Sequence, residues 1–428
     1  MTTPPDETSH PSPGRGESRY SRYRFVMAAL ILSAQLCVGL NVFPVSPLLP
    51  LAIEDYEINR ATAGLLVSLP LLVAATLGLP SGILLARIGL WRAFTLGWLS
   101  IALVSCSALA PNFITLLLIR SVIGLGFAVM LTATGPLLME WFRPKEILVM
   151  NALTTAVLSL GIALSVATAS PLAEIMAWQK ALSIYAFPGV LGLAAWLAFA
   201  RTSGASHRVV GISFREVGSV LRSRAVILLL AADAGVLSQY TAFTGWLPTF
   251  YNEERGISLS EGGFITGILP FVGMFGVLAG GALALRVGSP KTILTVSGIC
   301  AGLGGLGTFL FPGLGGIYPS IIIMGIGSWL YAPALLTLPM QMDGSTPERV
   351  AVVWGSLLTF TGFAMFLAPI IVGSLRDVSG SFFPGFAVFA AASWALLMAG
   401  ILLPKDVVAS QSQTAPGRPA FDNPKPDA

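Results

Sequence analysis

Hydrophobic residues occur along this chain in long continuous runs, which short polar segments separate. A membrane-spanning helix needs roughly 20 mostly apolar residues, and the longest runs reach about that length. The runs do not alternate between polar and apolar positions, which favours helices over the strands of a barrel. The sequence therefore predicts an all-α membrane protein with twelve transmembrane helices, at 25–50, 62–85, 93–110, 113–138, 148–171, 181–200, 225–250, 263–285, 292–312, 318–340, 351–375 and 384–403.

One long polar connection, 201–224, divides the predicted spans into six and six. We therefore expect a six-helix bundle at 23–200 and a second one at 225–404. The tails at 1–22 and 405–428 are polar and rich in small residues and proline, a composition typical of disorder.

Lys and Arg residues are distributed unequally between the two sides of these spans. One side holds 19 of them and the other side 4, and Arg120 lies inside a span, which accounts for all 24. Loops rich in Lys and Arg stay in the cytoplasm. We expect both termini and the segment 201–224 to be cytoplasmic, in the cell inner membrane.

The chain also repeats itself at a spacing of about 200 residues. Prolines and glycines recur in the same order in the two halves, as expected for a parallel repeat of six helices, which is one architecture of secondary transporters. The matching pairs are Pro50 and Pro248, Pro70 and Pro270, Gly82 and Gly281, Arg87 and Arg286, Gly89 and Gly288, Gly124 and Gly325, and Gly126 and Gly327.

Composition excludes several classes of protein. Hydrophobic residues make up 55% of the 428 residues and charged ones 10%, whereas soluble proteins carry about 25% charged residues. The net charge of +4 does not suggest nucleic-acid binding. Cys37, Cys106 and Cys300 are scattered, and His10 and His207 lie in polar segments. We therefore expect no metal site and no cofactor.

Two loops carry a related motif. GILLARIGLWR in the first half and GALALRVGSPK in the second resemble the signature loop of the major facilitator superfamily. Glycines permit a tight turn, and the basic residues hold the loop in the cytoplasm. A plain positive-inside loop is the alternative. The resemblance implies gating loops formed by Gly82, Arg87, Gly89, Arg92, Gly281, Arg286, Gly288 and Lys291.

The same loops depart from the family pattern at its acidic position. Ala86 and Leu285 stand where relatives have a carboxylate that helps to join the two halves on the cytoplasmic side. The outward-facing state of this chain must therefore be held by other contacts.

A second resemblance lies in the fourth span. IRSVIGLGFA is similar to the family's pattern at Arg120, Gly124 and Gly126. An arginine inside a span costs about 2.5–3.5 kcal/mol on insertion scales and usually marks function. Two interpretations stay open: Arg120 enters a central cavity and binds substrate, or it anchors the helix by bonding to backbone carbonyls.

In this family the first, fourth, seventh and tenth helices line the central cavity. The resemblance therefore implies that the polar residues of these helices bind substrate: Gln35, Asn41, Arg120, Gln239, Tyr240, Thr244, Trp329 and Tyr331.

Asp233 is the carboxylate that lies most clearly within a span, and it shares a helix face with Tyr240 and Thr244. A carboxylate buried in this way can take up a proton near neutral pH, so Asp233 is the candidate for proton coupling. The alternative is a solvated residue of the cytoplasmic vestibule, paired with Arg222 or Arg224.

These observations predict a secondary transporter that works as a monomer by alternating access. Its substrate is a small anionic or polar organic solute, moved with protons. The segment TGWLPTFYNEERGISLSEGG is similar to cyanate- and nitroimidazole-type permeases and to organic anion symporters of the superfamily. The alternatives are an exporter of hydrophobic compounds and a receptor or sensor without transport. The sequence contains no catalytic cluster of the kind an intramembrane enzyme needs. It also lacks the Gly-x-x-x-x-Gly-Lys-Ser/Thr loop of a nucleotide-driven pump.

Overall fold

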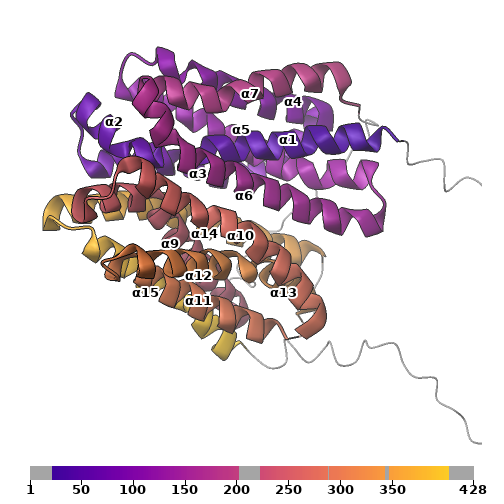
Figure 1. The fold of residues 1–428 in the computed structure, drawn as a ribbon. Coiled ribbons are helices and arrows are strands. Elements are labelled where there is room, and N and C mark those ends of the chain that lie inside the picture. The colour runs from indigo at the N-terminus through magenta and orange to yellow at the C-terminus, as the bar shows by residue number, and fades with distance from the viewer. Residues whose placement is uncertain (1–21, 202–221, 288, 343–346, 404–428) are drawn as a thin grey trace, which may run out of the picture.

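The computed structural model describes residues 22–201, 222–287, 289–342 and 347–403 (Figure 1). Within these ranges, twelve helices are long and apolar enough to cross a membrane, which confirms the predicted fold class. The predicted disordered tails and most of the predicted central loop lie outside the described residues.

The helices form two consecutive groups, which Figure 1 shows as two adjoining bundles. The first half comprises α1 (Arg24–Val42), η1 (Ser46–Leu48), α2 (Leu49–Tyr56), α3 (Arg60–Ile88), α4 (Leu90–Leu103), η2 (Val104–Leu109), α5 (Phe113–Trp141), α6 (Pro144–Ile175) and α7 (Trp178–Phe199). The second half comprises α9 (Arg224–Arg255), α10 (Leu259–Val287), α11 (Pro290–Leu310), α12 (Leu314–Leu330), α13 (Ala332–Gln341), α14 (Pro347–Ser379) and α15 (Phe383–Leu402).

Proline and glycine explain where the helices differ from the predicted spans. The first span, expected as one run at 25–50, breaks after Val42, because Pro44 and Pro47 cannot continue a helix. The seventh span extends beyond its predicted end at residue 250. It stops at Gly256, whose φ of 67° is a left-handed conformation that glycine adopts easily.

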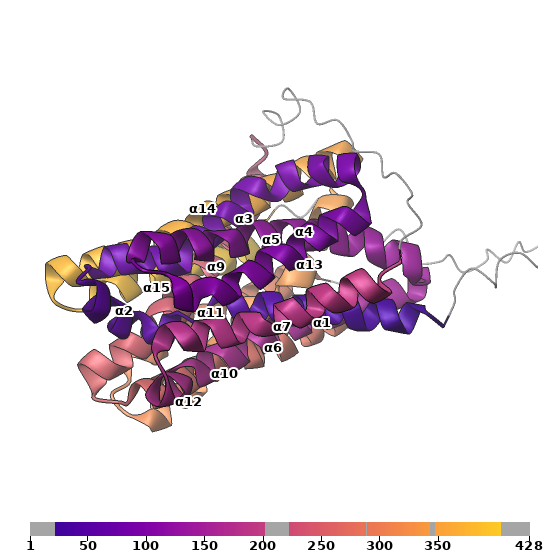
Figure 2. The same cartoon turned by 90° about the horizontal axis from the view of Figure 1, so that it is seen from above.

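Two pairs of helices join the halves, as Figures 1 and 2 show. Helix α14 packs along α3, and α10 packs along α6. Glycines permit the close approach: a Cβ added to Gly64 would lie 2.9 Å from the carbonyl oxygen of Pro369, and one added to Gly263 would lie 2.9 Å from that of Val166. Gly64 and Gly263 occupy equivalent places in the two repeats.

The halves separate toward the end of the bundle where α1 begins and α15 ends, here called the termini end. Gly82 of α3 and Gly281 of α10 lie five helical turns beyond Gly64 and Gly263, on the same faces of these helices. A Cβ on Gly82 would meet only Thr132 of its own half, at 3.9 Å, and one on Gly281 would meet nothing within 4 Å. The halves are therefore in contact at the opposite end and apart at the termini end.

The internal repeat also has a structural counterpart within each half. Gly124 of α5 lies against the backbone of α3 at Pro70, and its equivalent Gly325 of α12 lies against the backbone of α10 at Leu269. In both halves, a glycine lets the fourth helix approach the second helix beside a proline.

Candidate functional site

Arg120 lies on α5 with no exposed surface and bonds to the backbone of two other helices. Its Nε donates to the carbonyl oxygen of Leu66 on α3 at 2.9 Å. Its Nη2 donates to the carbonyl oxygens of Asn41 at 3.3 Å and Val42 at 3.0 Å, at the end of α1. Its Nη1 has no hydrogen-bond partner in the described part of the chain.

Prolines explain why these three carbonyl groups accept from a side chain. Pro70 has no backbone N–H, so the carbonyl of Leu66 four residues earlier lacks its helical partner. Helix α1 ends at Val42, and the last carbonyls of a helix have no partner within it. Arg120 supplies the donors that the proline-interrupted helices lack. This geometry fits an anchor, and it leaves one guanidinium nitrogen available.

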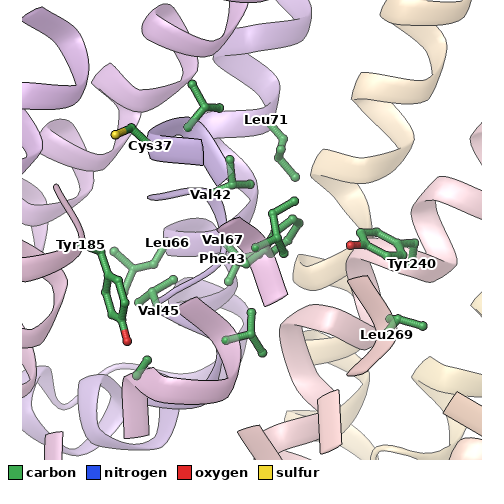
Figure 3. Close-up of a cluster of buried hydrophobic side chains, with 14 of the residues drawn as sticks. Cys37, Val42, Phe43, Val45, Leu66, Val67, Leu71, Tyr185, Tyr240 and Leu269 are labelled. Atoms are coloured by element: carbon green, nitrogen blue, oxygen red, sulfur yellow. The ribbon is translucent and has the colours of Figure 1, made fainter. Parts of the chain in front are cut away.

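Tyr240, Thr244 and Trp329 form a second group of buried polar atoms. The Tyr240 hydroxyl faces the Trp329 indole nitrogen and the Thr244 hydroxyl, but none of these three atoms has a hydrogen bond of good geometry. The Tyr240 ring meets the Trp329 ring edge-on, with centroids 5.5 Å apart. It also meets Phe43 of the first half edge-on, with centroids 6.3 Å apart. Figure 3 shows the side chains of Phe43, at the end of α1, and Tyr240, on α9. The group therefore lies at the boundary between the halves.

Asp233 lies on α9, two turns nearer the termini end than Tyr240. Its carboxylate accepts hydrogen bonds from the Tyr331 hydroxyl at 2.8 Å and the Thr361 hydroxyl at 2.6 Å. No ion pair joins it to a described Lys or Arg, Arg222 and Arg224 included. The carboxylate thus connects α9 to the end of α12 and to α14.

The three amide side chains predicted to bind substrate are engaged within their own halves. Asn41 donates to the carbonyl oxygen of Tyr185 on α7 at 3.0 Å, and Gln239 to that of Ala301 on α11 at 3.3 Å. Gln35 donates to a threonine hydroxyl of α5 at 2.9 Å. The amide oxygens of Asn41 and Gln239 are buried and have no hydrogen-bond partner among the described residues. The role of the three amides in binding substrate stays a prediction.

The predicted gating loops lie at the termini end. Gly89 has a φ of 82°, a conformation that favours glycine, and it separates α3 from α4. Its repeat partner Gly288 lies outside the described residues. The basic side chains of both loops are exposed or half-buried: Arg87, Arg92, Arg286 and Lys291.

At the opposite end, an ionic cluster joins the halves. Arg60 at the start of α3 pairs with Glu253 at 2.9 Å and with Asp377 at 3.5 Å, and Arg376 pairs with Glu253 at 3.1 Å and Glu254 at 3.6 Å. Asp377 also accepts from the backbone N–H of residue 61 at 3.2 Å. Sequence reasoning missed this cluster. The one available signal was the concentration of opposite charges near predicted helix ends on the side poor in basic residues.

Glu253→Gln is expected to loosen this end, because it removes the carboxylate that both arginines share. Partly exposed ion pairs contribute about 0.2–1 kcal/mol each, and Glu253 makes two of them, so opening should increase about two- to thirtyfold. The measurement is the rate at which an impermeant maleimide labels Ser170→Cys, a site buried beside the α6–α10 contact, in a background without the native cysteines. Glu54→Gln removes an exposed charge from the same end and should leave the rate unchanged. Equal rates in both variants would contradict a closing role.

Comparison with known proteins places the chain in a family. Residues 31–369 match the Major Facilitator Superfamily. The chain is 25% identical over 370 residues to the cyanate transport protein CynX of Escherichia coli K12, covering 84% of this chain and 93% of that protein. It is 22% identical to the probable L-galactonate transporter of the same organism, covering 77% and 78%.

A solved structure has the same fold. The bacterial homologue of the human lysosomal transporter Spinster, in an inward-facing and unoccupied conformation, superposes with a TM-score of 0.66 at 19% identity. The match covers 92% of this chain and 98% of that one. With the matched residues spanning most of both halves, the chain belongs to the major facilitator superfamily and is a multi-pass secondary transporter, not an enzyme.

Proposed function

We propose that the chain moves a small anionic solute across the cell inner membrane by alternating access. Every solute that the names of its relatives state is an anion: cyanate, L-galactonate, hexuronate, galactarate or D-glucarate, and nitrite. These relatives are only 22–25% identical to the chain, so the chemistry of the buried residues has to support the same solute class.

The observation that carries the proposal is a group of buried polar atoms at the boundary between the halves, which face one another without a hydrogen bond of good geometry. Tyr240, Thr244 and Trp329 can each donate a hydrogen bond, and the indole can only donate. A buried donor without a partner costs about 1–3 kcal/mol. A solute rich in acceptor oxygens removes that cost. Arg120 adds positive charge nearby, since it bonds to the carbonyl of Val42, next to the Phe43 that packs on Tyr240.

Tyr240→Phe tests this group, because it removes one donor and keeps the ring that packs on Phe43 and Trp329. A hydrogen bond to a charged solute is worth about 1.5–3 kcal/mol, so the KM for exchange should rise about tenfold or more. Tyr318→Phe is the matched control, since Tyr318 is half-buried on the same bundle and its side chain has no hydrogen bond with another described residue. An unchanged KM in Tyr240→Phe would show that the Tyr240 hydroxyl does not bind the solute.

Transport is coupled to protons in this proposal, with Asp233 as the group that binds the proton. Two observations support it: the carboxylate is joined only to hydroxyl groups, and it has no basic partner among the described residues. A carboxylate kept neutral by a proton crosses a low-dielectric interior more readily than an ionised one.

Both termini lie in the cytoplasm, as the bias of basic residues supports. Cysteines placed at Ser12, Ser206 and Ser412 should then resist an impermeant maleimide in intact cells and react after the cells are opened. Labelling of any of them in sealed cells would overturn this orientation. One copy of the chain supplies both sides of the site, and we propose that it works as a monomer.

Export of a hydrophobic compound is the second candidate. The aromatic rings of Phe43, Tyr240 and Trp329 around the unpartnered donors support it. Efflux of an apolar dye, compared with uptake of a labelled carboxylate in the same vesicles, separates the two.

A further inference from the structure

Asp233 is connected to the contact between the halves through a single side chain. Thr361 of α14 donates to the carboxylate at 2.6 Å. The next residue, Gly362, lies against Ala75 of α3 so closely that an added Cβ would clash with the alanine methyl group. Two consecutive residues of α14 therefore bond to Asp233 and pack across the halves.

We propose that Thr361 is a positioning residue, through which proton binding at Asp233 changes the contact between α14 and α3. This inference rests on the proposed coupling role of Asp233. An ionised carboxylate accepts strong hydrogen bonds from both Thr361 and Tyr331. When the carboxyl group takes up a proton, it loses charge and one of its oxygens becomes a donor, so it no longer accepts strongly from both hydroxyls.

Thr361 then has another partner available in its own helix. Threonine hydroxyls inside a helix commonly bond to the carbonyl four residues earlier, as Thr359 does to Gly355 at 2.9 Å. Turning of the Thr361 hydroxyl toward the carbonyl of Leu357 would remove this hydrogen bond between α14 and α9, while the bonds from Trp246 to Pro369 and from Arg376 to Glu253 remain nearer the opposite end. Because α14 also runs along α3 and carries Asp377 of the ionic cluster at its far end, a shift of α14 on α9 alters the contact between the halves.

The surroundings of Asp233 leave few groups to compete for this role. Tyr331 is the single titratable side chain of the described residues that touches the carboxylate. The described charged groups of the helices packed against α9 lie at helix ends and form no ion pair with Asp233: Glu261, Arg286, Lys291, Arg349, Arg376 and Asp377.

The test compares Thr361→Val, which keeps the shape and removes the donor, with Thr361→Ser, which keeps the donor. Thr359→Val is the matched control on the same helix. Spin labels replace Leu153 of α6 and Leu278 of α10, two exposed residues remote from the substitution. Their distance distribution is measured in proteoliposomes at about pH 5 and about pH 8.

We expect the distribution of the parent, of Thr361→Ser and of Thr359→Val to shift with pH, and that of Thr361→Val to stay the same. Asp233→Asn should also show no shift. If Asp233→Asn loses the shift and Thr361→Val keeps it, the inference is wrong while the coupling role of Asp233 stands. If Asp233→Asn keeps the shift of the parent, or the parent shows none, the coupling proposal and this inference fail together.

Discussion

Asp233→Asn should abolish accumulation of substrate against a gradient and leave exchange of substrate across the membrane intact. The amide keeps the size of the side chain and can still bond to Tyr331 and Thr361, but it cannot bind or release a proton. Uphill transport needs a net movement of protons, whereas exchange returns the carrier with substrate bound and needs none. The measurement is gradient-driven uptake beside exchange in proteoliposomes, between about pH 5 and pH 8.

Three outcomes are distinguishable. Loss of uphill transport alone assigns proton coupling to Asp233. Loss of both activities assigns substrate binding, because exchange requires a bound solute. Uphill transport equal to that of the parent over the whole pH range would show that Asp233 does not couple transport to protons.

Arg120→Ala should abolish transport and lower the stability of the folded protein. It leaves three carbonyl oxygens on α1 and α3 without donors in a dry interior, and each unsatisfied buried group costs about 1–3 kcal/mol. Arg120→Lys keeps the charge but loses the planar fork that reaches two helices at once, so it should lose most transport. Exchange and the melting temperature of the purified protein measure both effects.

A second substitution separates the two interpretations of Arg120. Pro70→Ala restores a backbone N–H that can bond to the carbonyl of Leu66, one of the acceptors that Arg120 satisfies. If Arg120 is an anchor, adding Pro70→Ala to Arg120→Ala should recover part of the lost melting temperature. If the double variant recovers stability but not exchange, Arg120 also binds substrate, through its free Nη1. Absence of any stability loss in Arg120→Ala would contradict the anchor.

The fold could be predicted from the sequence because each span needs only a local property, the length of an apolar run. The repeat could be predicted for the same reason, since glycines and prolines mark close approaches and breaks wherever they occur. Even the partners of Arg120 follow in part from local rules, because Pro70 identifies the carbonyl of Leu66 as one without a donor.

Parts of the candidate site depend on how helices are rotated and how the halves meet, which no local pattern determines. Asn41 and Gln239 sit on the expected helices, yet both amide nitrogens bond to helices of their own half. No sequence pattern distinguishes Thr361, because a threonine in an apolar run is common. Its contact with Asp233 is visible only in the structure. The ionic cluster requires Arg60 and Glu253, from different halves, to meet at one end.

Exchange of labelled solutes in proteoliposomes containing the purified chain tests the central claim most directly. The panel consists of a hexuronate, L-galactonate, cyanate and nitrite, with an organic cation and an apolar dye as comparisons. The proposed function predicts saturable exchange of at least one anion, with a KM that rises in Tyr240→Phe and not in Tyr318→Phe. Saturable transport of the dye or the cation, with no exchange of any anion, would contradict it.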